Sequence, residues 1–132
     1  GNLFAPVRGR RFGLVLANPP YVPSPGLPAR RGLARCWDGG VDGRLLLDRV
    51  CAGLPAVLAE QGVALVVHSA VCDPDLTVRR LGDAGLSASV VERAVVPFGP
   101  VMRRRAGLLE LRGLITAGQH EEEIVVVEAR RV

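Results

Sequence analysis

Residues 12–21 read FGLVLANPPY, an apolar run that ends in an asparagine, two prolines and a tyrosine. The hydrophobicity over Arg11–Ala17 is continuous rather than alternating, which predicts a strand buried on both faces, as in parallel sheets. The two prolines end this strand because they supply no backbone N–H to a neighbouring strand. We therefore expect residues 18–21, called the tetrad below, to lie at the carboxyl end of a parallel strand.

The rest of the sequence alternates helices and strands. Its pattern predicts helices over 43–60, 74–84 and 103–112, and strands over 63–67, 87–96 and 123–128. Asp42 is expected to cap the first helix, and Gly85 to end the second. Leu108, Leu109 and Leu111 are expected to anchor the third helix to the sheet. This order predicts an α/β fold with a largely parallel sheet.

The first predicted strand comes close to the start of the sequence. A strand buried on both faces is not expected at a sheet edge, because its unpaired backbone would bind other chains. We expect either that another chain pairs with this strand or that the sequence is the second half of a larger domain.

Composition excludes several classes of protein. The 132 residues suit one domain, and a content of 48% hydrophobic and 23% charged residues is that of a globular protein. No apolar run approaches the ~20 residues of a membrane span, and no signal peptide is visible. The net charge of +4 comes with 17 basic residues that are all arginine. Three widely spaced cysteines predict neither disulfides nor a zinc site, so we expect a cytoplasmic protein.

The tetrad, Asn18-Pro19-Pro20-Tyr21, can position an amide or an exocyclic amine. In open α/β sheets, ligands bind at the carboxyl ends of the strands. The side-chain oxygen of Asn18 and the backbone carbonyl of Pro19 can accept both N–H groups of such a target, which orients its nitrogen toward a methyl donor. Tyr21 can stack on the planar group. The alternative is a rigid turn with a buried tyrosine.

Two segments resemble a known family. Residues 12–23 are similar to the substrate-binding motif of class I S-adenosylmethionine-dependent amino-methyltransferases, and more narrowly to the HemK/PrmC-related protein-glutamine N5-methyltransferases. The glycine-rich element Trp37–Arg44, followed by Leu47-Asp48-Arg49, is closest to the short, release-factor-type branch of that family. The tetrad also occurs in adenine N6-methyltransferases, so this second element favours protein glutamine as the target.

This resemblance implies S-adenosyl-L-methionine as cofactor and, as partner, a peptide-chain release factor whose Gly-Gly-Gln glutamine is methylated. By analogy, Asn18 and Pro19 bind the amide, Tyr21 packs on it, and Pro20 completes the catalytic tetrad. Pro23 is expected to join Asn18 and Tyr21 in substrate binding. Asn2 stands where the family has an acidic residue that contacts the adenine, so Asn2 and Asn18 are the expected cofactor contacts. Eukaryotic members of the short branch also use a zinc-binding activator subunit.

The family's Asp-x-Gly-x-Gly-x-Gly cofactor loop is absent from the sequence. The family strand order, 3-2-1-4-5-7-6, then implies that residues 1–132 supply strands 4 to 7 of a Rossmann-like sheet, with the last strand antiparallel between its neighbours. We therefore interpret the chain as a single unit, the C-terminal part of a catalytic domain, which is expected to be inactive alone.

Three other functions stay open: adenine N6-methylation of RNA or DNA, which the arginines would suit, N-methylation of a small molecule, and a silent interaction module. Among single residues, His68 and Cys72 are expected to be structural, and Glu121–Glu123 to be a solvated run. No metal site is expected at His120. Arg103–Arg105 either hold an anionic group or face solvent, and Arg30, Arg31 and Arg35 are placed to touch a macromolecule.

Overall fold

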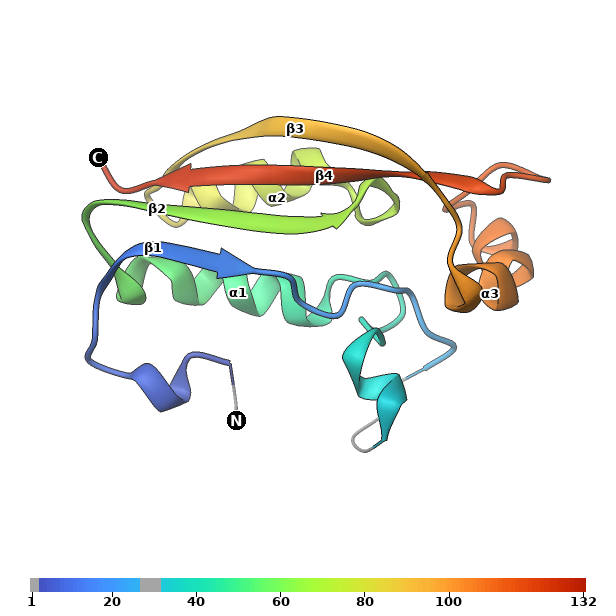
Figure 1. Cartoon of the computed structure of the whole chain (residues 1–132), viewed down its shortest axis with the longest axis horizontal. Coiled ribbons are helices and arrows are strands. Elements are labelled where there is room, and N and C mark those ends of the chain that lie inside the picture. The colour runs from blue at the N-terminus through green and yellow to red at the C-terminus, as the bar shows by residue number, and fades with distance from the viewer. Residues whose placement is uncertain (1–2, 27–31) are drawn as a thin grey trace.

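The computed structural model describes residues 3–26 and 32–132. Its main elements, in chain order, are β1 (Phe12–Ala17), α1 (Leu45–Val57), β2 (Leu58–Ser69), α2 (Pro74–Asp83), β3 (Ser87–Pro97), α3 (Pro100–Leu111) and β4 (Glu121–Arg130). Short 3-10 turns lie at Ala5–Val7, Leu33–Cys36 and Ala70–Cys72. The α/β class is therefore confirmed (Figure 1).

The four strands form one sheet in the order β1-β2-β4-β3. The prediction of a largely parallel sheet is wrong: β1 and β2 pair in parallel, but β2–β4 and β4–β3 are antiparallel. The physical reason is the place of β4, which runs back between β2 and β3, so that both of its pairs are antiparallel although β1, β2 and β3 share one direction. The expected place of the last strand, antiparallel between its neighbours, is confirmed.

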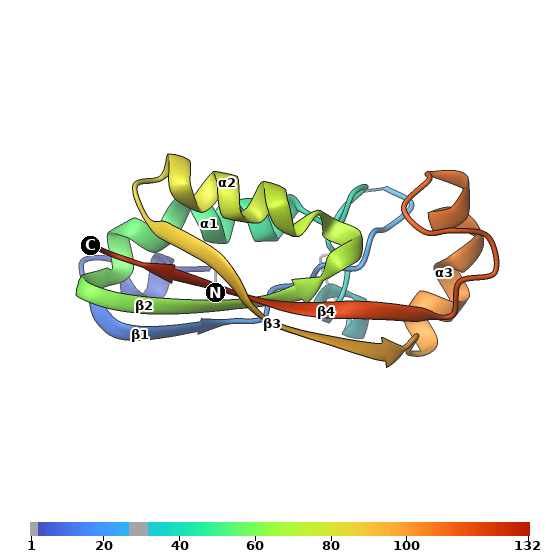
Figure 2. The same cartoon turned by 90° about the horizontal axis from the view of Figure 1, so that it is seen from above.

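Helices α1 and α2 cover one face of this sheet (Figure 2). Between them and the sheet lies the larger core, whose fully buried members include Leu47 and Leu54 of α1, Val66 of β2 and Val125 and Val127 of β4. Removing such side chains from water contributes about 1.5–3 kcal/mol each, which fixes the register of the central strands.

Strand β1 lies at an edge of the sheet, and its other face is open. The side chains of Leu14 and Leu16 are 59% and 70% exposed. The prediction of a strand buried on both faces is therefore wrong for the described residues, because no helix covers this face of β1 and no strand pairs with its outer edge. An apolar strand in this position is the unpaired edge that the sequence pattern argued against.

Helix boundaries differ from the predictions for local reasons. Helix α1 ends at Val57 rather than residue 60, because Leu58 is already extended. Asp42 does not cap α1: the N-cap is Arg44, whose backbone N–H donates to the Asp42 carboxylate at 2.9 Å. Gly85 ends α2 with φ of +93°, as expected. Helix α3 begins three residues earlier than predicted because Pro100 suits a first helical turn.

Helix α3 does not pack on the sheet as expected. It builds a second, smaller core in which Met102 and Leu109 contact Val22 and Phe98 beside the tetrad. Leu109 is fully buried, whereas Leu111 is 85% exposed, so the predicted anchoring role of Leu111 is wrong. In the ranges that the structure describes, none of the helices has the length and apolar character to span a membrane.

Candidate functional site

The tetrad follows β1 directly and lies at the carboxyl ends of β1 and β2, since Ala17 pairs with Val66. Asn18 is exposed, Pro19 is buried, and Pro20 and Tyr21 are half-buried. These four residues form one side of a cavity of about 140 Å³, which Val22, Cys36 and Trp37 complete. At ~30 Å³ per water molecule, this space suits a small planar group such as a carboxamide.

The segment that contributes Trp37 to the cavity is bound to the tetrad segment by backbone hydrogen bonds. The Val22 N–H donates to the Trp37 carbonyl at 2.8 Å, and the Gly39 N–H donates to the Val22 carbonyl at 2.8 Å. The two segments thus form an isolated parallel bridge between Val22 and Asp38. Tyr21 and Trp37, one from each of these two hydrogen-bonded segments, are the aromatic residues that line the cavity.

The glycine-rich element lies against the tetrad's backbone. A Cβ on Gly39 would lie 2.8 Å from the Cα of Tyr21, and one on Gly43 would lie 2.3 Å from the Tyr21 carbonyl oxygen. Gly43 also has φ of +77°, which side-chain-bearing residues rarely adopt. Glycines are needed at positions 39 and 43 for close packing against Tyr21.

Arg44, the last residue of this element, ties it to α1, α2 and the turn after β2. Its guanidinium is buried, pairs with Asp48 at 2.7 Å, donates to Thr77 at 2.9 Å, and also contacts the carbonyl of Cys72. The Cys72 thiol in turn donates to the Tyr21 carbonyl at 3.0 Å. Burial raises the pKa of this thiol to about 12, so Cys72 is a protonated hydrogen-bond donor, as its expected structural role requires.

His68 belongs to the same buried network. Its Nδ1 lies 2.7 Å from the Ser69 carbonyl and its Nε2 lies 2.9 Å from the Thr77 hydroxyl. A carbonyl only accepts, so Nδ1 carries the proton and Nε2 accepts from Thr77. Burial lowers the pKa of His68, which keeps the ring neutral. The expected structural role of His68 is confirmed.

Sequence reasoning missed Glu122. The run Glu121–Glu123 was expected to be solvated, but Glu122 is only 6% exposed, and its Oε1 has no hydrogen-bond partner among the described residues. Burial raises the pKa of Glu122, and a hydrogen bond with Ser69 opposes this. Burial also raises the pKa of Tyr21, with a smaller contribution from the nearby Glu122 charge. The alternation of β4 gave no signal for this burial.

Arg105 of α3 and Arg112, the C-cap of this helix, bind residues that follow the cavity lining in the sequence. Arg105 pairs with Asp38 at 2.6 Å and donates to the Pro23 carbonyl at 3.1 Å. Arg112 donates to the carbonyls of Ser24 at 2.8 Å and Val41 at 2.6 Å. For Arg105, the expected anionic partner is therefore Asp38 of the same chain. The sequence did not single out Arg112 at all.

Other predicted residues lie outside the site or outside the described residues. Asn2, Arg30 and Arg31 belong to the segments 1–2 and 27–31, which the structure does not describe. Arg35 is exposed on the turn Leu33–Cys36. His120 is exposed, and residues 3–26 and 32–132 contain no cluster of three metal-ligating side chains.

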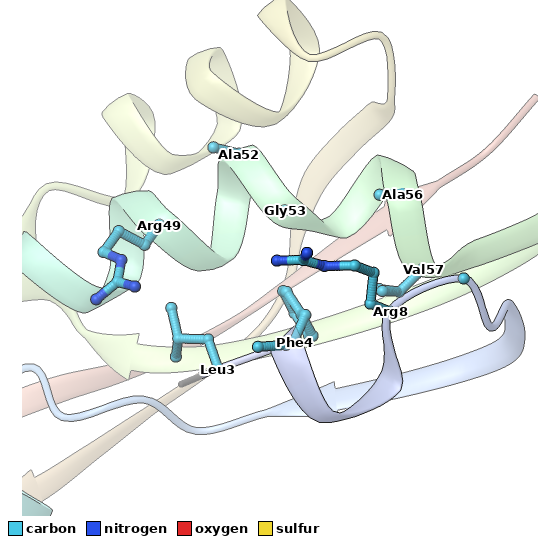
Figure 3. A pocket seen from close by; sticks show the side chains of 10 residues that line it. Leu3, Phe4, Arg8, Arg49, Ala52, Gly53, Ala56 and Val57 are labelled. Carbon is cyan, nitrogen blue, oxygen red and sulfur yellow. The ribbon is translucent and has the colours of Figure 1, made fainter. Parts of the chain in front are cut away.

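A second, larger groove lies on α1, away from the tetrad (Figure 3). It has a volume of about 460 Å³ and shares no lining residue with the tetrad cavity. The side chains of Phe4 and Arg8 lie beside Gly53, and those of Leu3 and Arg49 lie toward the other end. A Cβ on Gly53 would lie 2.7 Å from the Phe4 ring, so the glycine allows the segment before β1 to pack on the helix.

Comparison with known proteins identifies relatives of this chain. A protein of Methanocaldococcus jannaschii, provisionally named protein N5-glutamine methyltransferase, is 35% identical over 102 residues, which are 76% of this chain and 51% of that protein. The ribosomal protein uL3 glutamine methyltransferase of Bradyrhizobium diazoefficiens is 37% identical over 67 residues, 47% of this chain and 21% of that protein. The homologues of the present chain are therefore protein-glutamine N5-methyltransferases of the HemK/PrmC type.

A third such methyltransferase, the release factor glutamine methyltransferase of Moorella thermoacetica, is 46% identical over 48 residues, 33% of this chain and 17% of that protein. The chain thus spans about half the length of the M. jannaschii relative and less of the other two. No protein-family model matches the sequence.

The HemK/PrmC-type methyltransferases use S-adenosylmethionine, and the glycine-rich element Trp37–Arg44 does not form a cradle for that cofactor. Gly39 and Gly43 of this element pack against the backbone of Tyr21, which fills the space that a cradle would need. The tetrad cavity presents an amide, two prolines and two aromatic residues.

Proposed function

We propose that this chain is the acceptor-binding part of a protein-glutamine N5-methyltransferase, and that the tetrad cavity holds the glutamine side-chain amide. The observation that carries the proposal is the cavity of about 140 Å³ between the tetrad and Trp37, at the carboxyl end of β1. We further propose that residues 1–132 are the C-terminal part of the catalytic domain, and that the family's cofactor, S-adenosylmethionine, is held mainly by other residues.

Each tetrad residue has a role in this proposal. The exposed side-chain oxygen of Asn18 and the backbone carbonyl of Pro19 accept the two N–H groups of the amide, and Pro19 and Pro20 keep these acceptors rigid. Tyr21 and Trp37 pack on the flat faces of the carboxamide. An amide nitrogen is a weak nucleophile, so the chain contributes by fixing its orientation, which is catalysis by positioning.

The acceptor is proposed to be a glutamine in a translation protein. The names of two relatives specify a release factor and ribosomal protein uL3, and both are candidates for this chain. We favour the Gly-Gly-Gln loop of a release factor because Trp37–Arg44 is closest to the short branch of the family. We do not favour a nucleic acid, because Arg105 and Arg112 are engaged within the chain and are not available to bind phosphates.

The test uses Trp37, the single tryptophan of the sequence, as a fluorescent reporter of the cavity. A Gly-Gly-Gln peptide and a glutamine peptide from uL3 are titrated into the chain, and we expect saturable changes in emission. A Gly-Gly-Glu peptide is the matched control, because its carboxylate has no N–H groups to donate.

Asn18→Ala should weaken peptide binding about tenfold, the effect of losing ~1.4 kcal/mol of hydrogen bonding. Its thermal stability should match that of the unmodified chain because Asn18 is exposed. Equal binding of the glutamine and glutamate peptides, or unchanged affinity in Asn18→Ala, contradicts the proposal.

A further inference from the structure

Arg105 binds both segments that line the cavity, at the residues that follow Val22 and Trp37. Its Nη2 pairs with the carboxylate of Asp38, next to Trp37, and its Nη1 donates to the carbonyl of Pro23, two residues after Tyr21. The side chains of Arg105 and Asp38 are 18% and 8% exposed. This largely buried pair is therefore unlike a surface salt bridge, whose contribution is typically about 0–1 kcal/mol.

Arg112 repeats the same arrangement two helical turns later. It donates to the carbonyls of Ser24 and Pro25 on the tetrad side, at 2.8 and 3.2 Å, and to the carbonyl of Val41 on the glycine-rich side, at 2.6 Å. Seven residues are about two turns of an α-helix, so Arg105 and Arg112 project from similar sides of α3. Each arginine thus bridges the same pair of segments.

A guanidinium is suited to this task because it presents five N–H donors in a rigid plane. Lysine carries the same charge at the end of a flexible chain and cannot hold two acceptors in a fixed geometry. Three backbone hydrogen bonds also join the two segments: Val22 to Trp37, Gly39 to Val22, and Ser24 to Gly40. The arginines add side-chain contacts to both segments from α3 and its C-cap, which are more than 60 residues away in the sequence.

We propose that Arg105 and Arg112 are positioning residues that set the width of the tetrad cavity, so that α3 determines how closely the cavity fits the acceptor amide. The identity of the acceptor rests on the proposed function, but the control of cavity width does not. Arg104 supplies a matched control, because it lies on the same helix and is exposed.

The first experiment measures the accessibility of Trp37 by acrylamide quenching. Arg105→Lys and Arg112→Lys should each raise the quenching constant about twofold, whereas Arg104→Lys should leave it unchanged. Circular dichroism melts show whether each variant is folded at the temperature of the measurement. For a variant that is unfolded there, the same comparison is made for the other arginine, because either one is sufficient to test the proposal.

The second experiment measures the affinity for the Gly-Gly-Gln peptide. We expect about tenfold weaker binding in Arg105→Lys and Arg112→Lys, and unchanged binding in Arg104→Lys. Unchanged quenching in both folded lysine variants overturns the proposal that the two arginines set the width of the cavity. Raised quenching without any peptide binding to the unmodified chain overturns the proposed function and supports the role of the arginines in shaping the cavity. Raised quenching with unchanged affinity overturns their positioning role toward the acceptor.

Discussion

The thiol of Cys72 and the carbonyl oxygen of Tyr21 lie 3.0 Å apart and form a hydrogen bond that connects the tetrad to the turn after β2. Gly43 lies beside this bond, where there is no room for a side chain. A Cβ at Gly43 would lie 2.3 Å from the Tyr21 oxygen and 2.7 Å from the Cys72 sulfur. The position of the tetrad therefore depends on a glycine in a separate segment of the chain.

Gly43→Ala should lower the free energy of unfolding by about 2–5 kcal/mol, because it combines a left-handed backbone conformation with a clash against backbone. Denaturant unfolding followed by circular dichroism measures this change. Gly82→Ala is the control, because Gly82 lies in α2 with open space around it. It should raise stability by about 0.5–1 kcal/mol. Similar small effects in both variants would show that the tetrad does not need Gly43.

Glu122→Gln should stabilise the chain at neutral pH by about 1 kcal/mol, because a buried carboxylate with an unpartnered oxygen is costly. Its folded pKa is raised above the ordinary 4.5, so the wild-type chain loses stability as pH rises from 4.5 through the folded pKa. The difference between variant and wild type should therefore vanish below pH 4.5. Unfolding free energies measured across this pH range test whether the wild-type chain loses stability as pH rises. Glu121→Gln, at an exposed position, is the control.

His68 should make stability depend on pH in the opposite direction. Its folded pKa lies below 6.5, so stability is fully present above pH 6.5 and is lost as pH falls toward the folded pKa. The slope can reach about 1.4 kcal/mol per pH unit. His68→Gln should flatten this dependence, whereas His120→Gln, at an exposed site, should not change it. An unchanged slope in His68→Gln would contradict a lowered pKa of His68 in the folded state.

S-adenosylmethionine should give no binding heat in calorimetric titration of the 132-residue chain. The physical reason is that Gly39 and Gly43 pack against Tyr21, so the glycine-rich element offers the cofactor no cradle. The chain's folded state is checked in the same sample by circular dichroism. Binding with a stoichiometry near one would contradict this expectation and place a cofactor site among these residues.

Local sequence patterns predicted the main elements of the fold because each depends on neighbours within a few residues. The apolar run of β1 and the glycine after α2 are such signals. The pairing of the sheet was predicted less well, because periodicity gives the position of a strand but not its neighbours. The insertion of β4 between β2 and β3 made the sheet largely antiparallel.

In the candidate site, too, local features were predictable from the sequence and long-range contacts were not. The tetrad could be singled out from its own residues, whereas the residues that hold it could not. Arg105 meets Asp38 across 67 positions, and Arg112 meets Ser24 across 88, so no spacing rule connects them. Glu122 looked like one member of a solvated run because its burial comes from tertiary packing around the start of β4.

The exposed leucines of β1 have a practical consequence. With Leu14 and Leu16 uncovered on an unpaired strand, two copies of the chain can meet edge to edge and extend each other's sheets. Purified samples of the chain alone should then lose monomer as concentration rises, whatever the free energy of its fold. A charged residue in place of Leu16 would be the first change to make in preparing the protein for spectroscopy.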